Sequence, residues 1–140
     1  MVVKPTLLMG LGALAAATAL VAATQPPTLA QSVPGLWEIS GVPGTSSPLR
    51  QCLADVVALA RFEHRGKSCS AKVLKSAGST TLIDYNCGGA GFGHSEIEVI
   101  TPRSLRISTQ GISGGLPFNY VLQARRIDEC PKSTNAAVRH

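Results

Sequence analysis

The sequence predicts a mainly β domain of the α+β class: a curved antiparallel meander sheet of five to six strands, one short helix and two disulfides. Three observations lead to this prediction. Residues alternate with a period of two from Cys69 onward, which is typical of half-buried strands. Turns rich in glycine and proline separate the alternating segments. Four cysteines follow an N-terminal segment that has the features of an export leader.

The N-terminal segment has the composition of a cleavable signal peptide. Lys4 supplies the positive start, and an apolar run covers Leu7–Ala23. Small-residue cleavage sites end at Ala23 and again at Ala30. We favour cleavage after Ala30, because Pro26-Pro27 end the helical run and leave the second site extended. The expected organisation is a signal peptide at 1–30, a single disulfide-bonded domain at 31–130 and a flexible tail at 131–140.

A single membrane anchor is the alternative interpretation of the same apolar run. Leu7–Ala23 is about the shortest stretch that crosses a bilayer, for which ~17–25 residues are needed. It is rich in alanine and glycine, and no basic stop sequence flanks it. We therefore expect a periplasmic or secreted protein with no stable membrane span after cleavage of the leader.

The charge is moderately basic and widely spread. Thirteen basic and eight acidic residues give a formal net charge of +5. The basic residues form no long run, and few aromatic residues accompany them. This pattern argues against a nucleic-acid partner.

The first half of the domain is expected to hold a strand and the only helix. Leu36–Ser40 alternates as a strand does, whereas Pro48–Leu53 fits either a strand or the start of a helix. Asp55 is a good N-cap for the apolar segment that follows, and Gly66 ends that segment. A longer helix capped by Ser47 is the alternative.

A β-hairpin is expected over residues 69–87, with its turn at Ala77-Gly78-Ser79. When this segment is folded about Gly78, opposed residues match in character. The expected pairs are Cys69–Cys87, Ala71–Tyr85, Val73–Ile83, Lys72–Asp84 and Leu74–Leu82. A shift of one residue would break every match, so the pattern favours one register.

The second half of the domain continues with a flexible connection at Gly88–Gly93 and a second hairpin. This hairpin turns at Pro102 and places Val99 opposite Leu105, Ile97 opposite Ile107, and Glu98 opposite Arg106. We expect a loop at Gln110–Leu116 and then a last strand. In that strand Phe118, Tyr120, Leu122 and Ala124 alternate with Asn119, Val121 and Gln123.

The hairpin register ranks the three disulfide connectivities that four cysteines allow. Directly opposed strand residues have Cα atoms ~4.5–5.5 Å apart, a distance that a disulfide spans. The register therefore favours Cys69–Cys87 and leaves Cys52–Cys130 as the second bond.

Several segments together resemble one bacterial family. They are Pro34-Gly35-Leu36-Trp37-Glu38, Arg50-Gln51-Cys52-Leu53, the spaced Cys69 and Cys87, and Ala124-Arg125-Arg126-Ile127-Asp128-Glu129-Cys130. Their order is similar to that in the domain of unknown function 3617 family, found in exported proteins of Gram-negative bacteria. The resemblance implies an exported, largely β domain and supplies no catalytic residues. The chain departs from the family where Ala54-Asp55 replaces the Pro or Thr that often precedes the helix.

No residue pattern predicts catalysis, a metal site or a cofactor. His94 with Glu96 and Glu98 is the best candidate for acid–base chemistry, but the alternation favours a solvated strand face on which Glu98 pairs with Arg106. Gly88–Gly93 fits no phosphate-binding motif, and Ser113 lacks the nucleophile-elbow pattern. We therefore expect no catalytic residues, no metal and no cofactor.

Four aromatic residues are expected either to line a ligand cavity or to form the core: Trp37, Tyr85, Phe118 and Tyr120. Our first functional hypothesis is a non-catalytic binding or envelope-maintenance module that holds a small apolar ligand between sheet and helix. The alternative is an inhibitor that binds an envelope protein or a foreign hydrolase through the loop Gly111–Pro117. A hydrolase using His94 ranks third.

Overall fold

The computed structural model describes residues 26–132, in which seven strands form one antiparallel sheet. The strands are β1 (Gly35–Ser40), β2 (Leu49–Leu53), β3 (Ser70–Ala77), β4 (Thr80–Asn86), β5 (Gly91–Thr101), β6 (Ser104–Ser113) and β7 (Leu116–Asp128). Three short 3₁₀ helices accompany them: η1 (Leu29–Gln31), η2 (Val56–His64) and η3 (Gly88–Ala90). Most of the expected leader (1–25) and most of the expected tail (133–140) lie outside the described residues.

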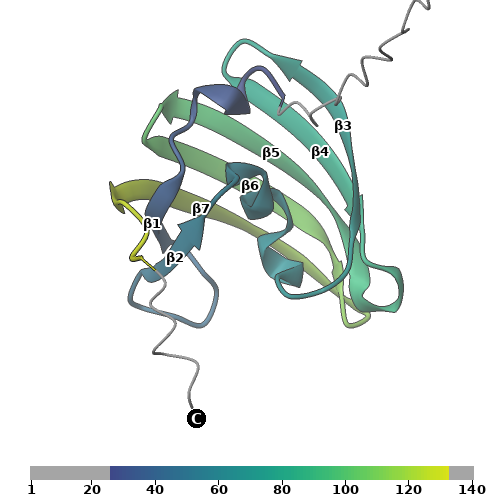
Figure 1. The fold of residues 1–140 in the computed structure, drawn as a ribbon. Coiled ribbons are helices and arrows are strands. Elements are labelled where there is room, and N and C mark those ends of the chain that lie inside the picture. The colour runs from purple at the N-terminus through teal and green to yellow at the C-terminus, as the bar shows by residue number, and fades with distance from the viewer. Residues whose placement is uncertain (1–25, 133–140) are drawn as a thin grey trace, which may run out of the picture.

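The strand order is β2-β1-β7-β6-β5-β4-β3, which corrects the expected five to six strands in meander order. Only β3 to β7 form a meander. The segment that contains η2 leads from β2 at one edge of the sheet to β3 at the other, and the curved sheet bends around η2 (Figure 1). The mainly β class, the antiparallel sheet and the helix are confirmed.

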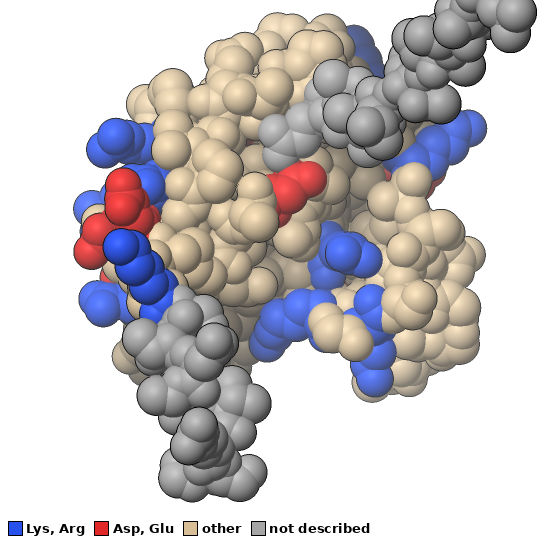
Figure 2. Space-filling view, in the orientation of Figure 1, with Lys and Arg blue, Asp and Glu red and all other residues tan. Residues whose placement is uncertain are grey.

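The first strand, β1, pairs with the last strand, β7, and this pairing is the reason that the strand order differs from a simple meander. Glu38 of β1 lies opposite Arg50 of β2 and Arg125 of β7, and its carboxylate is 3.5 Å and 3.3 Å from their guanidinium nitrogens. Opposed charges favour one pairing over others, although exposed ion pairs contribute little stability. Acidic and basic side chains gather at this edge, formed by β1, β2 and β7 (Figure 2). A contact between residues so distant in sequence could not be predicted from local patterns.

The core lies between the sheet and η2. The largest fully buried side chains include Trp37, Phe62, Leu29, Ile39, Leu59, Ile83, Ile97, Leu105, Ile107 and Leu122. The expected N-cap is confirmed, because the Asp55 carboxylate accepts a hydrogen bond of 2.8 Å from Val57 N–H. The helix bends at Arg61, whose backbone is not helical. The sheet and η2 thus fill the space in which we expected an apolar ligand.

The first hairpin has the predicted register only in the half that is far from its turn. Ala71–Tyr85, Lys72–Asp84 and Val73–Ile83 are paired as expected. The Leu74–Leu82 pair is wrong, because a bulge between Val73 and Lys75 places Lys75 opposite Leu82. The bulge compensates for a two-residue turn, Gly78-Ser79, that is one residue shorter than expected.

The second hairpin pairs as predicted over Ile97–Val99 and Leu105–Ile107. The expected loop at Gln110–Leu116 is wrong. β6 continues to Ser113, β7 begins at Leu116, and only Gly114-Gly115 form the turn. The expected connection at Gly88–Gly93 is likewise shorter, since β5 begins at Gly91. Much of the two glycine-rich segments that we expected to be loops is therefore strand.

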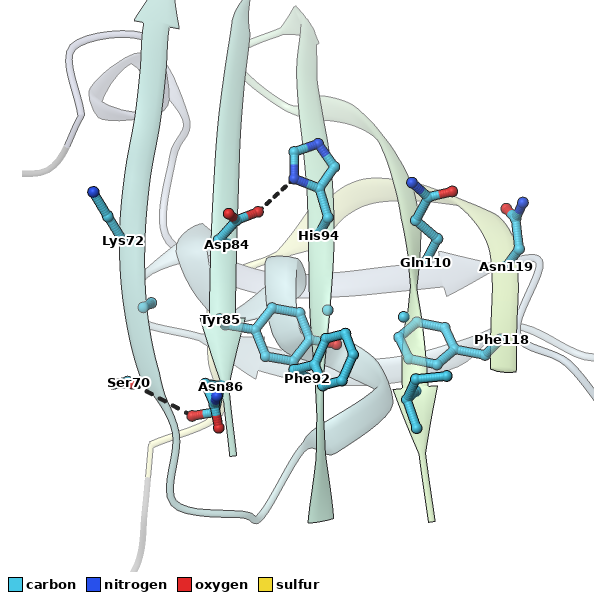
Figure 3. Close-up of a pocket in the computed structure, with 14 residues that line it drawn as sticks. Ser70, Lys72, Asp84, Tyr85, Asn86, Phe92, His94, Gln110, Phe118 and Asn119 are labelled. Carbon is cyan, nitrogen blue, oxygen red and sulfur yellow. Dashed lines mark hydrogen bonds and ion pairs between the residues drawn. The ribbon is translucent and has the colours of Figure 1, made fainter. Parts of the chain in front are cut away.

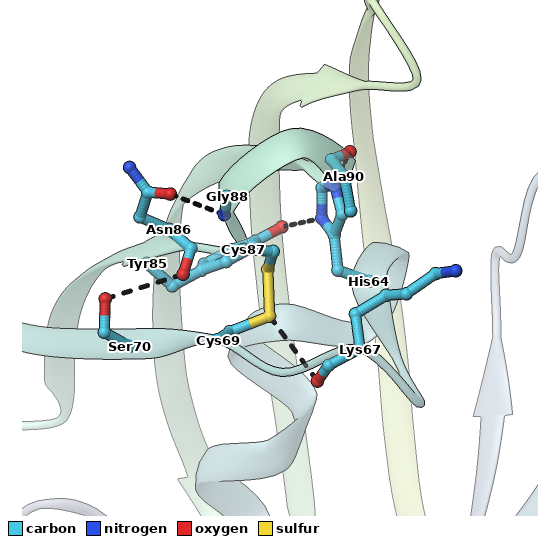
Figure 4. The surroundings of a disulfide bond; sticks show 9 residues. All are labelled: His64, Lys67, Cys69, Ser70, Tyr85, Asn86, Cys87, Gly88 and Ala90. Carbon is cyan, nitrogen blue, oxygen red and sulfur yellow. Dashed lines mark hydrogen bonds between the residues drawn. A yellow bond between two sulfur atoms is a disulfide. The ribbon is translucent and has the colours of Figure 1, made fainter.

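Both disulfides have the expected partners. The Cα atoms are 4.1 Å apart in Cys69–Cys87 and 5.5 Å apart in Cys52–Cys130. Cys69–Cys87 joins the start of β3 to the end of β4 beside η3 (Figure 4). Two disulfides in a small domain are typical of proteins outside the cytoplasm. No helix between residues 26 and 132 is long and apolar enough to cross a membrane.

Candidate functional site

A row of polar side chains crosses five strands on the face of the sheet that points away from η2. Each residue lies directly opposite the next on the neighbouring strand. The row consists of Lys72, Asp84, His94, Gln110 and Asn119 (Figure 3). We call it the polar row. Its side chains alternate along their strands with buried residues such as Ser95, which donates a hydrogen bond to the Ala60 carbonyl of η2.

A second row lies two residues away along each strand and is partly apolar. It consists of Ser70, Asn86, Phe92 and Ile112. Phe92 is 52% exposed, which is unusual for so large an apolar side chain. Together the two rows flank a groove of about 980 Å³. This volume lies within the range of sites that bind small molecules.

The backbone of one register row forms the floor between these side chains. The row runs through Ala71, Tyr85, Gly93, Gly111 and Phe118. Its side chains alternate with those of the polar row and therefore point toward the other face. The Tyr85 ring covers Gly93, and the Phe118 ring covers Gly111. A β-carbon on Gly93 would lie 2.5 Å from the Tyr85 hydroxyl oxygen, so the close packing requires glycine.

The charges in the groove are partly matched. His94 Nδ1 lies 2.5 Å from Asp84 Oδ1, and both side chains are substantially exposed. Lys72 lies on the other side of Asp84 in the register. A second hollow of about 250 Å³ adjoins the groove at His94, Gln110 and Asn119. The groove therefore offers one carboxylate, one permanent cation and several neutral hydrogen-bonding groups.

His94 contacts a residue of the neighbouring strand and not Glu96 or Glu98 of its own strand. His94, Glu96 and Glu98 share a strand face as predicted, and Glu98 lies opposite Arg106. The group that contacts His94 is Asp84 on the neighbouring strand. Within residues 26–132 no three His, Cys, Asp or Glu side chains lie close enough together to hold a metal ion.

A buried histidine supports the floor from the inner face. His64 Nε2 donates a hydrogen bond of 3.0 Å to the Ala90 carbonyl, because that oxygen can only accept (Figure 4). His64 Nδ1 then accepts one of 3.1 Å from the Tyr85 hydroxyl. The imidazole also contacts the rings of Tyr85 and Phe118 edge to face. His64 lies in the last turn of η2 and is only 3% exposed, so its side chain belongs to the interior of the domain.

Of the four aromatic candidates, some belong to the core and others line the groove. Trp37 is a core residue, and its indole N–H donates to the Val33 carbonyl at 3.1 Å. The Tyr120 hydroxyl donates to Glu63 at 2.8 Å, and burial raises the pKa of Tyr120. Burial likewise raises the pKa of Tyr85. Only Tyr85 and Phe118 contribute to the groove, and they do so through its floor.

Sequence reasoning missed Lys72, Asp84, Gln110 and Asn119 as members of one site. Each is an ordinary polar residue in its own strand. They come together only through four successive strand pairings. The available clue was the Lys72–Asp84 match in the first hairpin.

Comparisons of the chain with family models, with curated proteins and with solved structures find no match. Because a sheet of this kind can host many functions, function is inferred from the chemistry of the groove.

Proposed function

We propose that the protein is an exported, non-catalytic binding module that holds a single-chain anionic amphiphile in the groove. The observation that carries this proposal is the apolar pair Phe92 and Ile112 lying alongside the polar row in one hollow. The location, periplasmic or secreted, and membership of the domain of unknown function 3617 family are part of the same proposal.

The apolar side of the groove suits a hydrocarbon chain. Phe92 exposes about half of its surface in the absence of a ligand, and Ile112 beside it is partly exposed. Covering apolar surface contributes roughly 25 cal/mol per Å² removed from water. Gly93 and Gly111 in the groove floor have no side chains that would keep the hydrocarbon chain away from Phe92 and Ile112.

The polar side suits an anionic head group. Lys72 carries a positive charge, and the amides of Gln110 and Asn119 supply hydrogen-bond donors. Asp84 is the one carboxylate that lines the groove, and His94 contacts it. The net charge, which is +5 with Lys4 of the leader included, further favours encounter with anions.

The test is calorimetric titration of the oxidised protein with laurate, compared with dodecyl maltoside, which has the same chain and a neutral head. We expect laurate to bind more tightly. Lys72→Gln should weaken laurate binding about tenfold, since hydrogen bonds to charged groups contribute roughly 1.5–3 kcal/mol. Phe92→Ser should weaken binding of both ligands.

Matched controls lie on the same strands. Lys75→Gln changes a lysine of β3, and Ile100→Ser changes a 54% exposed residue of β5; neither residue lines the groove. Both variants should bind as the parent does. The proposal is wrong if no variant changes laurate binding, or if the neutral amphiphile binds as tightly as laurate.

A second candidate is a module that binds a protein partner through the turn between β6 and β7. The observation in its favour is Leu116, which is 71% exposed next to the two-residue Gly114-Gly115 turn, where both glycines have positive φ. Affinity capture from an envelope extract should recover one stoichiometric protein, and Leu116→Ser should abolish that recovery. Recovery that Leu116→Ser leaves unchanged would exclude this turn.

A further inference from the structure

The segment that precedes β1 is an integral part of the domain core. Leu29 is fully buried and belongs to the main hydrophobic cluster, and Thr28 is only 3% exposed. The segment runs along one end of the sheet from the β3–β4 hairpin to β1 (Figure 1). Its buried side chains distinguish it from a loose lead-in.

Hydrogen bonds join this segment to the turns of two hairpins. Ser76 Oγ donates to Thr28 Oγ1 at 3.0 Å, and Thr28 Oγ1 donates to the Gly78 carbonyl at 3.4 Å. Further along, Val33 N–H donates to the Pro102 carbonyl at 3.0 Å. The segment therefore links the turn between β3 and β4 to the turn between β5 and β6.

The bond expected to be cleaved lies inside this structure. Ala30–Gln31 belongs to η1, and Ala30 N–H donates to the Pro26 carbonyl at 3.0 Å. Cleavage after Ala30 would separate Thr28 and Leu29 from the domain. Tolerance to truncation depends on the burial and hydrogen bonding of the residues removed, and here both are high.

We infer that signal peptidase cleaves this chain after Ala23 and that the mature protein begins at Thr24. The sequence Val21-Ala22-Ala23 has the required small residues and precedes Thr28 and Leu29, the first buried residues of the described range 26–132. The mature chain then keeps the Pro26 carbonyl, Thr28 and Leu29. This inference rests on the exported location proposed above.

The direct test is expression of the full chain with its leader in a Gram-negative host, followed by intact-mass analysis of the exported protein. We expect an N-terminus at Thr24. An N-terminus at Gln31 would overturn the inference and leave the exported location standing. An intact Met1 terminus would overturn both.

A pair of variants tests the choice of site independently. Ala23→Leu should cause the uncleaved precursor to accumulate, because the site requires a small residue there. Ala30→Leu is the matched control, since Ala30 is exposed in η1. It should be processed at the normal rate, and the opposite pattern would overturn the inference.

A stability measurement tests whether Leu29 contributes to the core, which is the reason for placing the cleavage site after Ala23. In the mature protein, Leu29→Ala should lower Tm by roughly 10 °C or more, as a large-to-small change in a core does. Gln31→Ala, at an exposed position of η1, should leave Tm nearly unchanged. Equal Tm values for the two variants would show that Leu29 does not contribute to the core and would overturn the inference.

Discussion

The ring of Tyr85 lies directly across Gly93, its partner on the neighbouring strand, and its hydroxyl group reaches the imidazole of His64 beyond. This relationship connects the two faces of the sheet. On the inner face, Tyr85 joins η2 to the sheet through His64. On the outer face, the backbones of Tyr85 and Gly93 form the middle of the groove floor.

Substitution of Gly93 should destabilise the protein. In Gly93→Ala the new methyl group would lie 2.5 Å from the Tyr85 ring, so the ring or the strand must shift. Overpacking of this kind typically costs about 1–3 kcal/mol. Gly89→Ala is the control, because no atom lies within 4 Å of its β-carbon position. Urea denaturation should separate the two variants, and equal midpoints would contradict the packing described.

Replacement of His64 should destabilise the protein, because its buried imidazole forms two hydrogen bonds. His64→Phe keeps an aromatic ring but leaves the Tyr85 hydroxyl and the Ala90 carbonyl without their partner. A buried group without a partner costs roughly 1–3 kcal/mol. His94→Phe, which loses only a solvent-exposed contact to Asp84, should change the free energy of unfolding by less than about 0.5 kcal/mol. A larger loss for His94→Phe would reverse the roles assigned to the two histidines.

The tyrosines should not titrate normally in the folded protein. The chain contains two, Tyr85 and Tyr120, and burial raises the pKa of both above the ordinary value of 10.0. Above pH 10 the unfolded chain loses these protons while the folded chain retains them. Stability contributed by the two hydroxyls is therefore complete below pH 10 and falls as the pH rises further. Near-ultraviolet absorbance should show tyrosinate forming at a higher pH in the folded protein than in the unfolded chain, and a normal titration in folded protein would contradict this.

The two disulfides should contribute unequally. Removing Cys69–Cys87 by double substitution with alanine should cost about 2–5 kcal/mol. Removing Cys52–Cys130 should cost about 1 kcal/mol more, because its sequence separation is 78 residues against 18, and the longer loop restricts the unfolded chain more. Guanidinium denaturation of the two double variants measures the difference. Non-reducing peptide mapping tests the pairing itself, and a peptide joining Cys52 to Cys69 would contradict it.

Local sequence determined the elements whose partners lie close along the chain. The register of the second hairpin, the cap at Asp55 and the Cys69–Cys87 bond all follow from residues within about 20 positions of one another. In such segments hydrophobic alternation and turn chemistry act together on a short loop, so one register dominates. The class of fold followed from the same alternation.

Tertiary structure alone decided the long-range features. Pairing of β1 with β7, burial of Leu29 and His64, and assembly of the polar row across five strands depend on contacts between distant segments. Glycines that suggested loops became strand residues, because Gly93 and Gly111 lie beneath aromatic rings from neighbouring strands. Sequence patterns record the local preference of each residue. They do not record which side chain of a neighbouring strand will occupy the space above it, and that packing produced both the groove and its floor.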